Sequence, residues 1–363
     1  MKKYCKREFE RMSFSWTLII LSLKHNLVYC PIVFTGIMLM GCSSAPVKSI
    51  THINLVTTKT NSLNTLPSKI TTRTLSLDRD SLKIGQIKDI AFGDSVCYVL
   101  DMNANVFRIP YNVESRSKVI NKRGNGPGEY IAPVAIDIYD NDVYVLDIAT
   151  SSVLKYDENL NSVNSIRLSH PADDIIVFDY GIMASNLDLK TCASPFIIYD
   201  FDGKILADLS KNTVNKEPAA YKICTNPFLN IEDSVYALDG NTNKLYVVKD
   251  QEIVMKYEFD FGDRAQPKDI VLDVDNYSKY ALSTNCFHIG DKAILSYLIE
   301  NKRMYCFYDK VTGFIWNGSL RETADGFPFF PKWQKDNELV GVLESPDDSE
   351  NGSLLFYSID VEK

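Results

Sequence analysis

The sequence KRGNGPGEYIAPVAIDIYDNDVYVLD, residues 122–147, decides the fold class. It begins with three glycines and one proline between residues 124 and 128, a composition typical of a tight loop. The rest alternates apolar and polar residues with period two, as half-buried strands do. Polar residues 140–142 interrupt this alternation and indicate a turn. The stretch therefore predicts a glycine-rich loop that leads directly into a β-hairpin.

The hairpin recurs along the chain. Identical copies of Tyr-Val-Leu-Asp begin at Tyr98 and Tyr144, which are 46 positions apart. Similar pairs of apolar runs joined by polar turns give six units in total, at residues 97–109, 143–156, 179–203, 234–248, 291–309 and 336–360. No long segment after residue 50 has the 3.6-residue period of a helix. The chain is therefore expected to be all-β and built from repeated units.

A repeat of roughly 40–50 residues is typical of the blades of a β-propeller. One blade cannot bury both of its faces, whereas six blades arranged radially can. We therefore predict a six-bladed β-propeller over residues 69–363, with blades of mostly four antiparallel strands. The final strand, residues 353–361, is expected to close the ring by pairing with a strand near residues 71–77, which leaves few unpaired edges. An open sandwich of six hairpins is the competing fold.

Residues 124–160 resemble an NHL repeat. The matching positions are Gly126, Pro127, Gly128, Glu129, Tyr130, Pro133, Asp137, Tyr144, Val145, Asp147, Tyr156 and Asp157. The whole chain is similar to six-bladed, TolB-like propeller lipoproteins of Bacteroidetes. On this view the glycine loop joins the outer strand of one blade to the inner strand of the next. We expect the loop to be scaffold, and the aspartate ending each Tyr-Val-Leu-Asp to cap a turn.

The N-terminal region has the features of an export signal. Residues 1–41 carry six Lys or Arg against two Glu, and the apolar run at residues 27–40 suits a signal-peptide core but is short for a membrane span. Gly41-Cys42 after this run resembles the lipobox of bacterial lipoproteins, which implies a lipid on Cys42 and a stable membrane anchor. An uncleaved anchor and an ordinary cleaved signal are the alternatives. Residues 42–68 are rich in Ser, Thr and Asn, and we expect a flexible tether.

Charge narrows the range of partners and locations. Residues 42–363 carry a net charge of −12, since residues 1–41 contribute +4 to the total of −8. So acidic a chain argues against nucleic-acid binding, which needs a basic surface. No acidic cluster follows Cys42, which in the lipoproteins that the chain resembles favours the periplasm over the cell surface. We expect a monomeric outer-membrane lipoprotein of the cell envelope that faces the periplasm.

Metal and redox chemistry have little support in the sequence. Five cysteines follow Cys42, at positions 97, 192, 224, 286 and 306. Cys97 and Cys306 lie in strand-like runs and are expected in the core, while the other three allow one disulfide whose pairing the sequence does not fix. There is no Cys-x-x-Cys motif. Only three histidines follow the predicted signal peptide, at positions 52, 170 and 288. We therefore predict no metal site or cofactor, although a central Ca²⁺ or other cation is left open.

The segment DGFPFFPKW, residues 325–333, contains the most distinctive aromatic cluster. Aromatic side chains at the mouth of a propeller can stack on sugars or hold peptides, and packing within the closing blade is the alternative. The candidate ligand contacts are Arg123, Asn125, Glu129, Phe329, Lys332 and Trp333.

The sequence favours a non-catalytic binding module for a protein, peptide or glycan partner. The alternative is a propeller enzyme of the lactonase, lyase or sugar dehydrogenase type with a site in the central channel. Three or more convergent Asp, Glu, Asn or His side chains in the channel would favour the enzyme. An apolar or unpatterned channel would exclude it.

Overall fold

The computed structural model describes most of the chain after residue 49. The described residues are 50–56, 66, 68–78, 80–112, 114–186, 194–209, 224, 226–231, 234–249, 251–267, 276–344 and 352–361. They belong to one compact unit, Ser49–Lys363. The predicted signal peptide at residues 1–41, the lipid attachment site Cys42 and Cys192 lie outside them. Among the helices in this part of the chain, none combines the length and apolar character that a membrane crossing requires.

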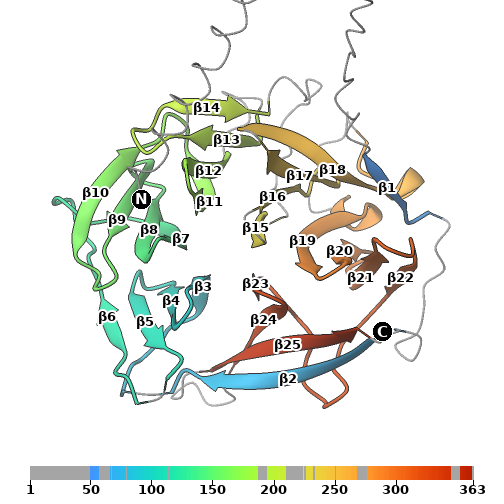
Figure 1. Ribbon diagram of the computed structural model, residues 1–363, viewed down its shortest axis with the longest axis horizontal. Coiled ribbons are helices and arrows are strands. Elements are labelled where there is room, and N and C mark those ends of the chain that lie inside the picture. Colours follow the sequence, from blue (N-terminus) through green and yellow to red (C-terminus); the bar gives the residue numbers. More distant parts are fainter. Residues whose placement is uncertain are drawn as a thin grey trace, which may run out of the picture. The chain divides into compact units, whose positions relative to one another are not determined.

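Six small sheets stand in a ring (Figure 1). Blade 1 contains β3 (Ile87–Phe92), β4 (Val96–Asp101), β5 (Val106–Pro110) and β6 (Lys118–Ile120). Blade 2 contains β7 (Pro133–Tyr139), β8 (Asp142–Asp147), β9 (Ser152–Tyr156) and β10 (Ser162–Arg167). Blade 3 contains β11 (Ala172–Phe178), β12 (Gly181–Asn186), β13 (Phe196–Tyr199) and β14 (Ile205–Asp208).

The second half of the ring follows the same plan, with strands added from the N-terminal region. Blade 4 contains β15 (Phe228–Ile231), β16 (Ser234–Asp239), β17 (Lys244–Lys249), β18 (Glu252–Asp260) and β1 (Thr51–Asn54). Blade 5 contains β19 (Leu282–Ile289), β20 (Lys292–Ile299), β21 (Lys302–Asp309) and β22 (Ile315–Gly318). Blade 6 contains β23 (Trp333–Lys335), β24 (Glu338–Leu343), β25 (Ser353–Val361) and β2 (Ser68–Ser76).

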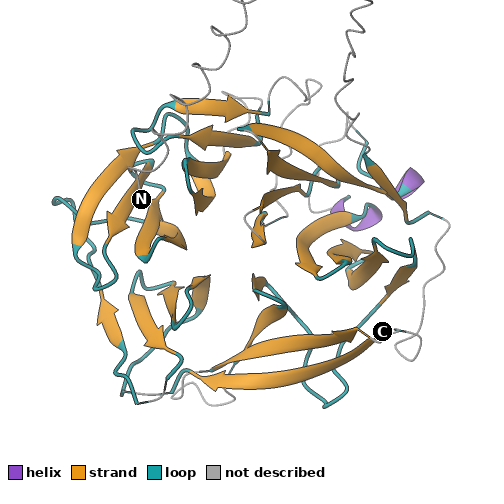
Figure 2. Cartoon of the chain, viewed as in Figure 1, coloured by secondary structure: helices purple, strands orange, loops and turns teal. Residues whose placement is uncertain are grey.

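The six-bladed β-propeller predicted from the repeats is confirmed. Each repeated sequence unit forms the second and third strands of one blade, and consecutive strands within a blade pair in antiparallel order. The only helices in the described residues are two short 3₁₀ turns, Gly262–Arg264 and Tyr277–Lys279 (Figure 2). Apolar side chains of neighbouring blades pack against each other, so the core lies between the sheets.

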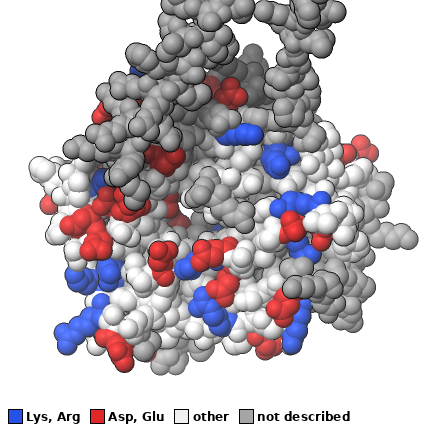
Figure 3. All heavy atoms as spheres, viewed as in Figure 1, with Lys and Arg blue, Asp and Glu red and all other residues white. Residues whose placement is uncertain are grey.

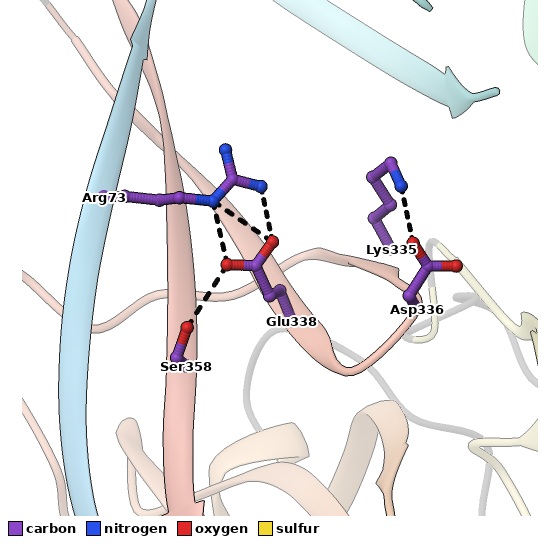
Figure 4. Close-up of polar contacts among 5 residues, drawn as sticks. All are labelled: Arg73, Lys335, Asp336, Glu338 and Ser358. Carbon is purple, nitrogen blue, oxygen red and sulfur yellow. Dashed lines mark hydrogen bonds and ion pairs between the residues drawn. The ribbon is translucent and has the colours of Figure 1, made fainter. Parts of the chain in front are cut away.

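The two ends of the described chain close the ring. Strand β2 pairs with β25 without interruption from Ser68↔Val361 to Ser76↔Ser353, as the sequence predicted. The Nε of Arg73 on β2 donates to Oε1 of Glu338 on β24 at 2.9 Å, and Oγ of Ser358 on β25 donates to the same oxygen at 3.2 Å (Figure 4). An exposed ion pair contributes only about 1 kcal/mol or less. The backbone hydrogen bonds between β2 and β25 are therefore the main closure.

Part of the expected tether is ordered. Residues Thr51–Asn54 form β1, which pairs in parallel with β18. The side chain of Ile53 is fully buried beside Tyr257 and Phe259. The prediction of a flexible tether over residues 42–68 is therefore wrong for these four residues. A strand this short shows little alternation, and its parallel partner lies about 200 positions away in the sequence, so no local pattern reveals it.

The glycine loop lies between β6, the outermost strand of blade 1, and β7, the innermost strand of blade 2. Glu129 Oε2 accepts a hydrogen bond from the backbone N–H of Gly126 at 2.8 Å, and the hydroxyl of the fully buried Tyr130 donates to Ala104 O at 2.9 Å. Gly128 has a φ of 72°, and a Cβ on it would lie 2.4 Å from the Cβ of Ser162. The loop is thus a scaffold that passes close to β10, the outer strand of blade 2.

The effect of the close contact at Gly128 on stability can be measured separately from the effect of its backbone conformation. Gly313 has a φ of 73° and no heavy atom within 4 Å of the position that a Cβ would occupy, so Gly313→Ala carries the backbone strain alone, about 1 kcal/mol. Gly128→Ala adds the clash with Ser162 and is expected to cost roughly 2 kcal/mol more. Chemical denaturation measures both free energies of unfolding. Equal losses in the two variants would show that the loop does not need to approach Ser162.

Candidate functional site

A cavity of about 270 Å³ lies at the centre of the ring. Side chains from the innermost strands, or from residues next to them, line its wall. The polar and aromatic ones that matter most are Asp89, Asp137, Asp174, Asn230, Lys332 and Trp333. Figure 3 shows acidic and basic side chains close together near the middle of the face it draws. The channel is therefore polar.

β-Bulges set which residues of the innermost strands take equivalent places in different blades. The pairing register shifts between Ile87 and Asp89 in blade 1 and between Ala172 and Asp174 in blade 3. The same shift occurs in blade 2 before Ala135 and in blade 5 before Asn285. A bulge breaks the period-two alternation and re-aims the next side chain. Polar residues thus recur at one structural position in blades 1, 3 and 5.

Asp89 is a junction between blades. Asp89 is buried, with 7% of the residue exposed. Oδ2 accepts from the backbone N–H of Ile136 in blade 2 at 2.8 Å, and Oδ1 accepts from Nε1 of Trp333 in blade 6 at 2.9 Å. Burial raises the pKa of Asp89, and these hydrogen bonds and nearby Lys332 oppose the rise. The carboxylate therefore stabilises the inner wall of the ring.

Asp137 repeats this contact one blade further on. Its Oδ2 accepts a hydrogen bond from the backbone N–H of Val177 on β11 at 2.6 Å. Burial raises the pKa of Asp137 to about 7, which the hydrogen bond from Val177 opposes and the neighbouring Asp89 increases. Within the described part of the chain, no basic side chain forms an ion pair with Asp137.

Lys332 and Trp333, two of the residues singled out from the sequence, do line the cavity. The Nζ of Lys332 lies 4.9 Å from the centroid of the Trp333 ring, within the range of a cation–π contact. Burial lowers the pKa of Lys332, and the attraction of Asp89 opposes this change. Blade 6 therefore contributes a basic and aromatic part of the cavity wall, next to Asp89 of blade 1.

The other candidate residues lie elsewhere. Arg123, Asn125 and Glu129 are in the glycine loop and are absent from the cavity lining. Phe329 is fully buried between Tyr305 and Tyr357, with ring centroids 5.0 Å from each. Phe329 offers no surface to a ligand, and packing of the closing blade explains its place in the aromatic segment.

His288, Cys286 and Cys306 are poorly suited to catalysis, and of these Cys286 lines the cavity. Burial lowers the pKa of His288 to about 4, and its ring stacks on Tyr236. Burial raises the pKa of both Cys286 and Cys306 to about 12, so these thiols are not activated nucleophiles. Cys97 and Cys306 are fully buried, as predicted from their strand positions. No set of three or more His, Cys, Asp or Glu in the described residues is arranged to hold a metal ion.

The aspartates were missed because the sequence shows only their local pattern. The aspartates that end Tyr-Val-Leu-Asp do cap turns, as expected: Asp101 Oδ1 accepts from the backbone N–H of Asn103 at 2.9 Å and of Asn105 at 2.8 Å. In sequence, Asp89 and Asp137 resemble these turn-capping aspartates. In the structure, however, their carboxylates accept hydrogen bonds from the next blade. Their strand position, directly before the repeated hairpin, is the signal that could have identified them.

The raised pKa of Asp137 predicts a pH-dependent stability. The unfolded carboxyl group ionises near pH 4, but the folded one holds its proton to about pH 7, so this contribution is complete below pH 4 and lost as pH rises through 7. Asp137→Asn keeps an acceptor for the Val177 N–H and does not ionise. It should match the wild type at pH 4 and be more stable at pH 8, by on the order of 1 to 4 kcal/mol.

Denaturation of both proteins across this pH range measures the difference. Asp263→Asn is the matched control, because Asp263 is exposed in the first 3₁₀ turn and should show no such trend. A stability difference between Asp137→Asn and the wild type that stays constant from pH 4 to pH 8 would contradict the prediction.

Two solved structures with the same fold come from Bacteroides species. A "Putative exported protein" of Bacteroides fragilis NCTC 9343 is 18% identical with a TM-score of 0.64, and the match covers 86% of this chain and 100% of that one. A member of the DUF4221 family from Bacteroides vulgatus is 10% identical with a TM-score of 0.52, covering 80% of this chain and 98% of that one. No curated protein matches the sequence. The family described as "Domain of unknown function (DUF4934)" matches residues 117–354, and the chain belongs to this family.

Proposed function

We propose that this protein is an envelope-anchored lipoprotein whose propeller binds a protein, peptide or glycan partner at the central cavity without catalysing a reaction. The observation that carries this proposal is the use of the cavity carboxylates. Asp89 and Asp137 each accept a backbone N–H from the next blade, at 2.8 and 2.6 Å. Groups committed to holding the scaffold are poor candidates for proton transfer, whereas the remaining polar surface can recognise a ligand.

The enzyme alternative has one observation in its favour. Three aspartates from blades 1, 2 and 3 line one polar cavity, which is the kind of convergence that a propeller enzyme of the lactonase, lyase or sugar dehydrogenase type would use. Against it stand the scaffold contacts of Asp89 and Asp137 and the depressed pKa of His288. The binding role is therefore preferred.

The anchor rests on the N-terminal sequence. The lipobox-like Gly41-Cys42 follows an apolar run, and a solved structure with this fold is described as an exported protein. Nine residue steps separate Cys42 from Thr51 of β1, so an extended chain between them spans roughly 30 Å at most. A lipid on Cys42 would thus hold the ring close to the membrane, and we infer that it faces the periplasm.

Affinity capture from the native envelope tests the proposed function. A partner bound at the cavity should be recovered with the tagged wild type and reduced severalfold with Lys332→Gln, which removes the basic group from the cavity wall. Lys83→Gln is the matched control, since Lys83 is exposed and outside the cavity lining, and it should retain the partner. Mass spectrometry of the eluates provides the comparison.

Three outcomes would contradict parts of the proposal. Equal recovery of the partner with Lys332→Gln and the wild type would place binding away from the cavity. A stoichiometric metal in the purified wild-type domain, with turnover of lactones or sugars, would favour the enzyme instead. Cys42→Ser should move the protein to the soluble fraction; continued membrane association would reject the lipid anchor.

A further inference from the structure

Phe330 is the exposed member of the aromatic segment at residues 325–333. It is 52% exposed, whereas the neighbouring Phe329 is fully buried. Both residues lie in the connection between β22 of blade 5 and β23 of blade 6. The sequence selected Phe329 as a ligand contact, but of these two side chains only that of Phe330 can reach a partner.

The backbone that carries Phe330 is held in place. The hydroxyl of Tyr357 donates a hydrogen bond to Pro328 O at 2.7 Å, and the hydroxyl of Tyr305 donates to Phe329 O at 3.1 Å. The Pro-Phe-Phe-Pro sequence of residues 328–331 also fixes φ at both of its ends. An aromatic side chain on so restrained a backbone loses little conformational entropy on binding, which favours its use in recognition.

A guanidinium group lies over the exposed ring. The Cζ of Arg303, on β21 of blade 5, is 5.9 Å from the centroid of the Phe330 ring, within the range of a cation–π contact. The Nη1 of Arg303 donates to Ser296 Oγ at 3.4 Å, which uses one of the five N–H donors of the group. A guanidinium stacked on a ring can still offer its edge to a carboxylate in a bidentate pair.

Lys332 adds a second positive charge two positions after Phe330, and it also lines the central cavity. Burial lowers the pKa of Lys332, Asp89 opposes this change, and the like charge of nearby Arg303 adds to it. Within the part of the chain that the structure describes, neither Arg303 nor Lys332 forms an ion pair with a carboxylate. Two cations beside one exposed ring therefore make a surface that is complementary to negative charge.

We propose that Phe330, Arg303 and Lys332 form a docking surface, next to the central cavity, for an acidic peptide segment of a protein partner. This inference rests on the proposed function, because it names the class of partner and the residues that hold it. Aromatic residues and arginine are enriched at the centre of protein–protein interfaces, where a few such residues carry most of the binding energy. An acidic peptide supplies a carboxylate for the cations and an apolar side chain for the ring.

Isothermal titration of the full-length lipoprotein in a non-ionic detergent tests this surface. The probe is the peptide acetyl-Leu-Glu-Leu-Glu-amide, and acetyl-Leu-Gln-Leu-Gln-amide is the matched neutral peptide. The wild type should bind the acidic peptide at least about tenfold more tightly than the neutral one, because hydrogen bonds to an ionised carboxylate are the stronger ones. This preference should shrink as the salt concentration rises, since salt screens exposed charges.

Substitutions then assign the binding to the named residues. Phe330→Ala and Arg303→Gln should each weaken binding of the acidic peptide at least about fivefold. Arg303→Lys keeps the charge but not the planar fork, so its affinity should be intermediate. Phe314→Ala and Arg116→Gln are the matched controls and should bind as the wild type does, because Phe314 is 49% exposed in the turn after β21 and Arg116 is exposed before β6.

Thermal denaturation separates a loss of binding from a loss of folding. Phe330 is exposed, so Phe330→Ala should unfold at the wild-type temperature and keeps the test decisive even if Arg303→Gln is unstable. No binding of the acidic peptide by the wild type, or equal binding by Phe330→Ala and the wild type, would overturn the surface. Tighter binding of an oligogalacturonate than of the acidic peptide, with the same dependence on Arg303, would overturn the assignment to a peptide.

Capture from the native envelope connects the surface to the physiological partner. Recovery of that partner should fall severalfold in Phe330→Ala and in Arg303→Gln, as it should in Lys332→Gln. A partner that is lost in Lys332→Gln but retained in both of the other variants would leave the proposed function intact and reject this inference alone.

Discussion

The pairing of β2 with β25 is the constraint on which the rest of the structure depends. A strand from near the start of the described chain and one from its end form a single ladder, from Ser68↔Val361 to Ser76↔Ser353. Without β2, blade 6 would expose the edge of β25, and this backbone ladder would no longer hold the ring shut. Because the ring closes, six inner strands converge on one axis and enclose a small polar cavity.

The inner wall then solves a second problem, which is how to join sheets that share no backbone ladder. Apolar packing holds neighbouring blades along their faces, but it does not specify their alignment at the axis. Asp89 and Asp137 do so by accepting backbone N–H groups from the next blade. The requirement to bury carboxylates for this purpose leaves negative charge in the cavity. The same two carboxylates therefore align the blades and line the central cavity.

Much of the fold could be predicted from the sequence, whereas little of the site could. The Tyr-Val-Leu-Asp copies and the glycine loop report local strands and turns, and their spacing indicates the number of blades. Lys332 and Trp333, which line the cavity, were selected because they stand in an unusual aromatic segment, yet the same reasoning selected Phe329, which is buried. The roles of Asp89 and Asp137 depend on bulges and on contacts between blades, and neither leaves a pattern in a single strand. Strand β1 was not predicted for the same reason, since its partner is distant in sequence.

The central claim, that β2 closes the ring, is tested most directly by native-state hydrogen exchange of the wild-type protein. The β2 amides that donate to β25 should exchange only through global unfolding, with the same free energy of opening as the amides of the inner strands β3 and β7. This result would show that closure and the rest of the ring are one cooperative unit. Rapid exchange of these β2 amides, with protection retained in the other blades, would contradict the account.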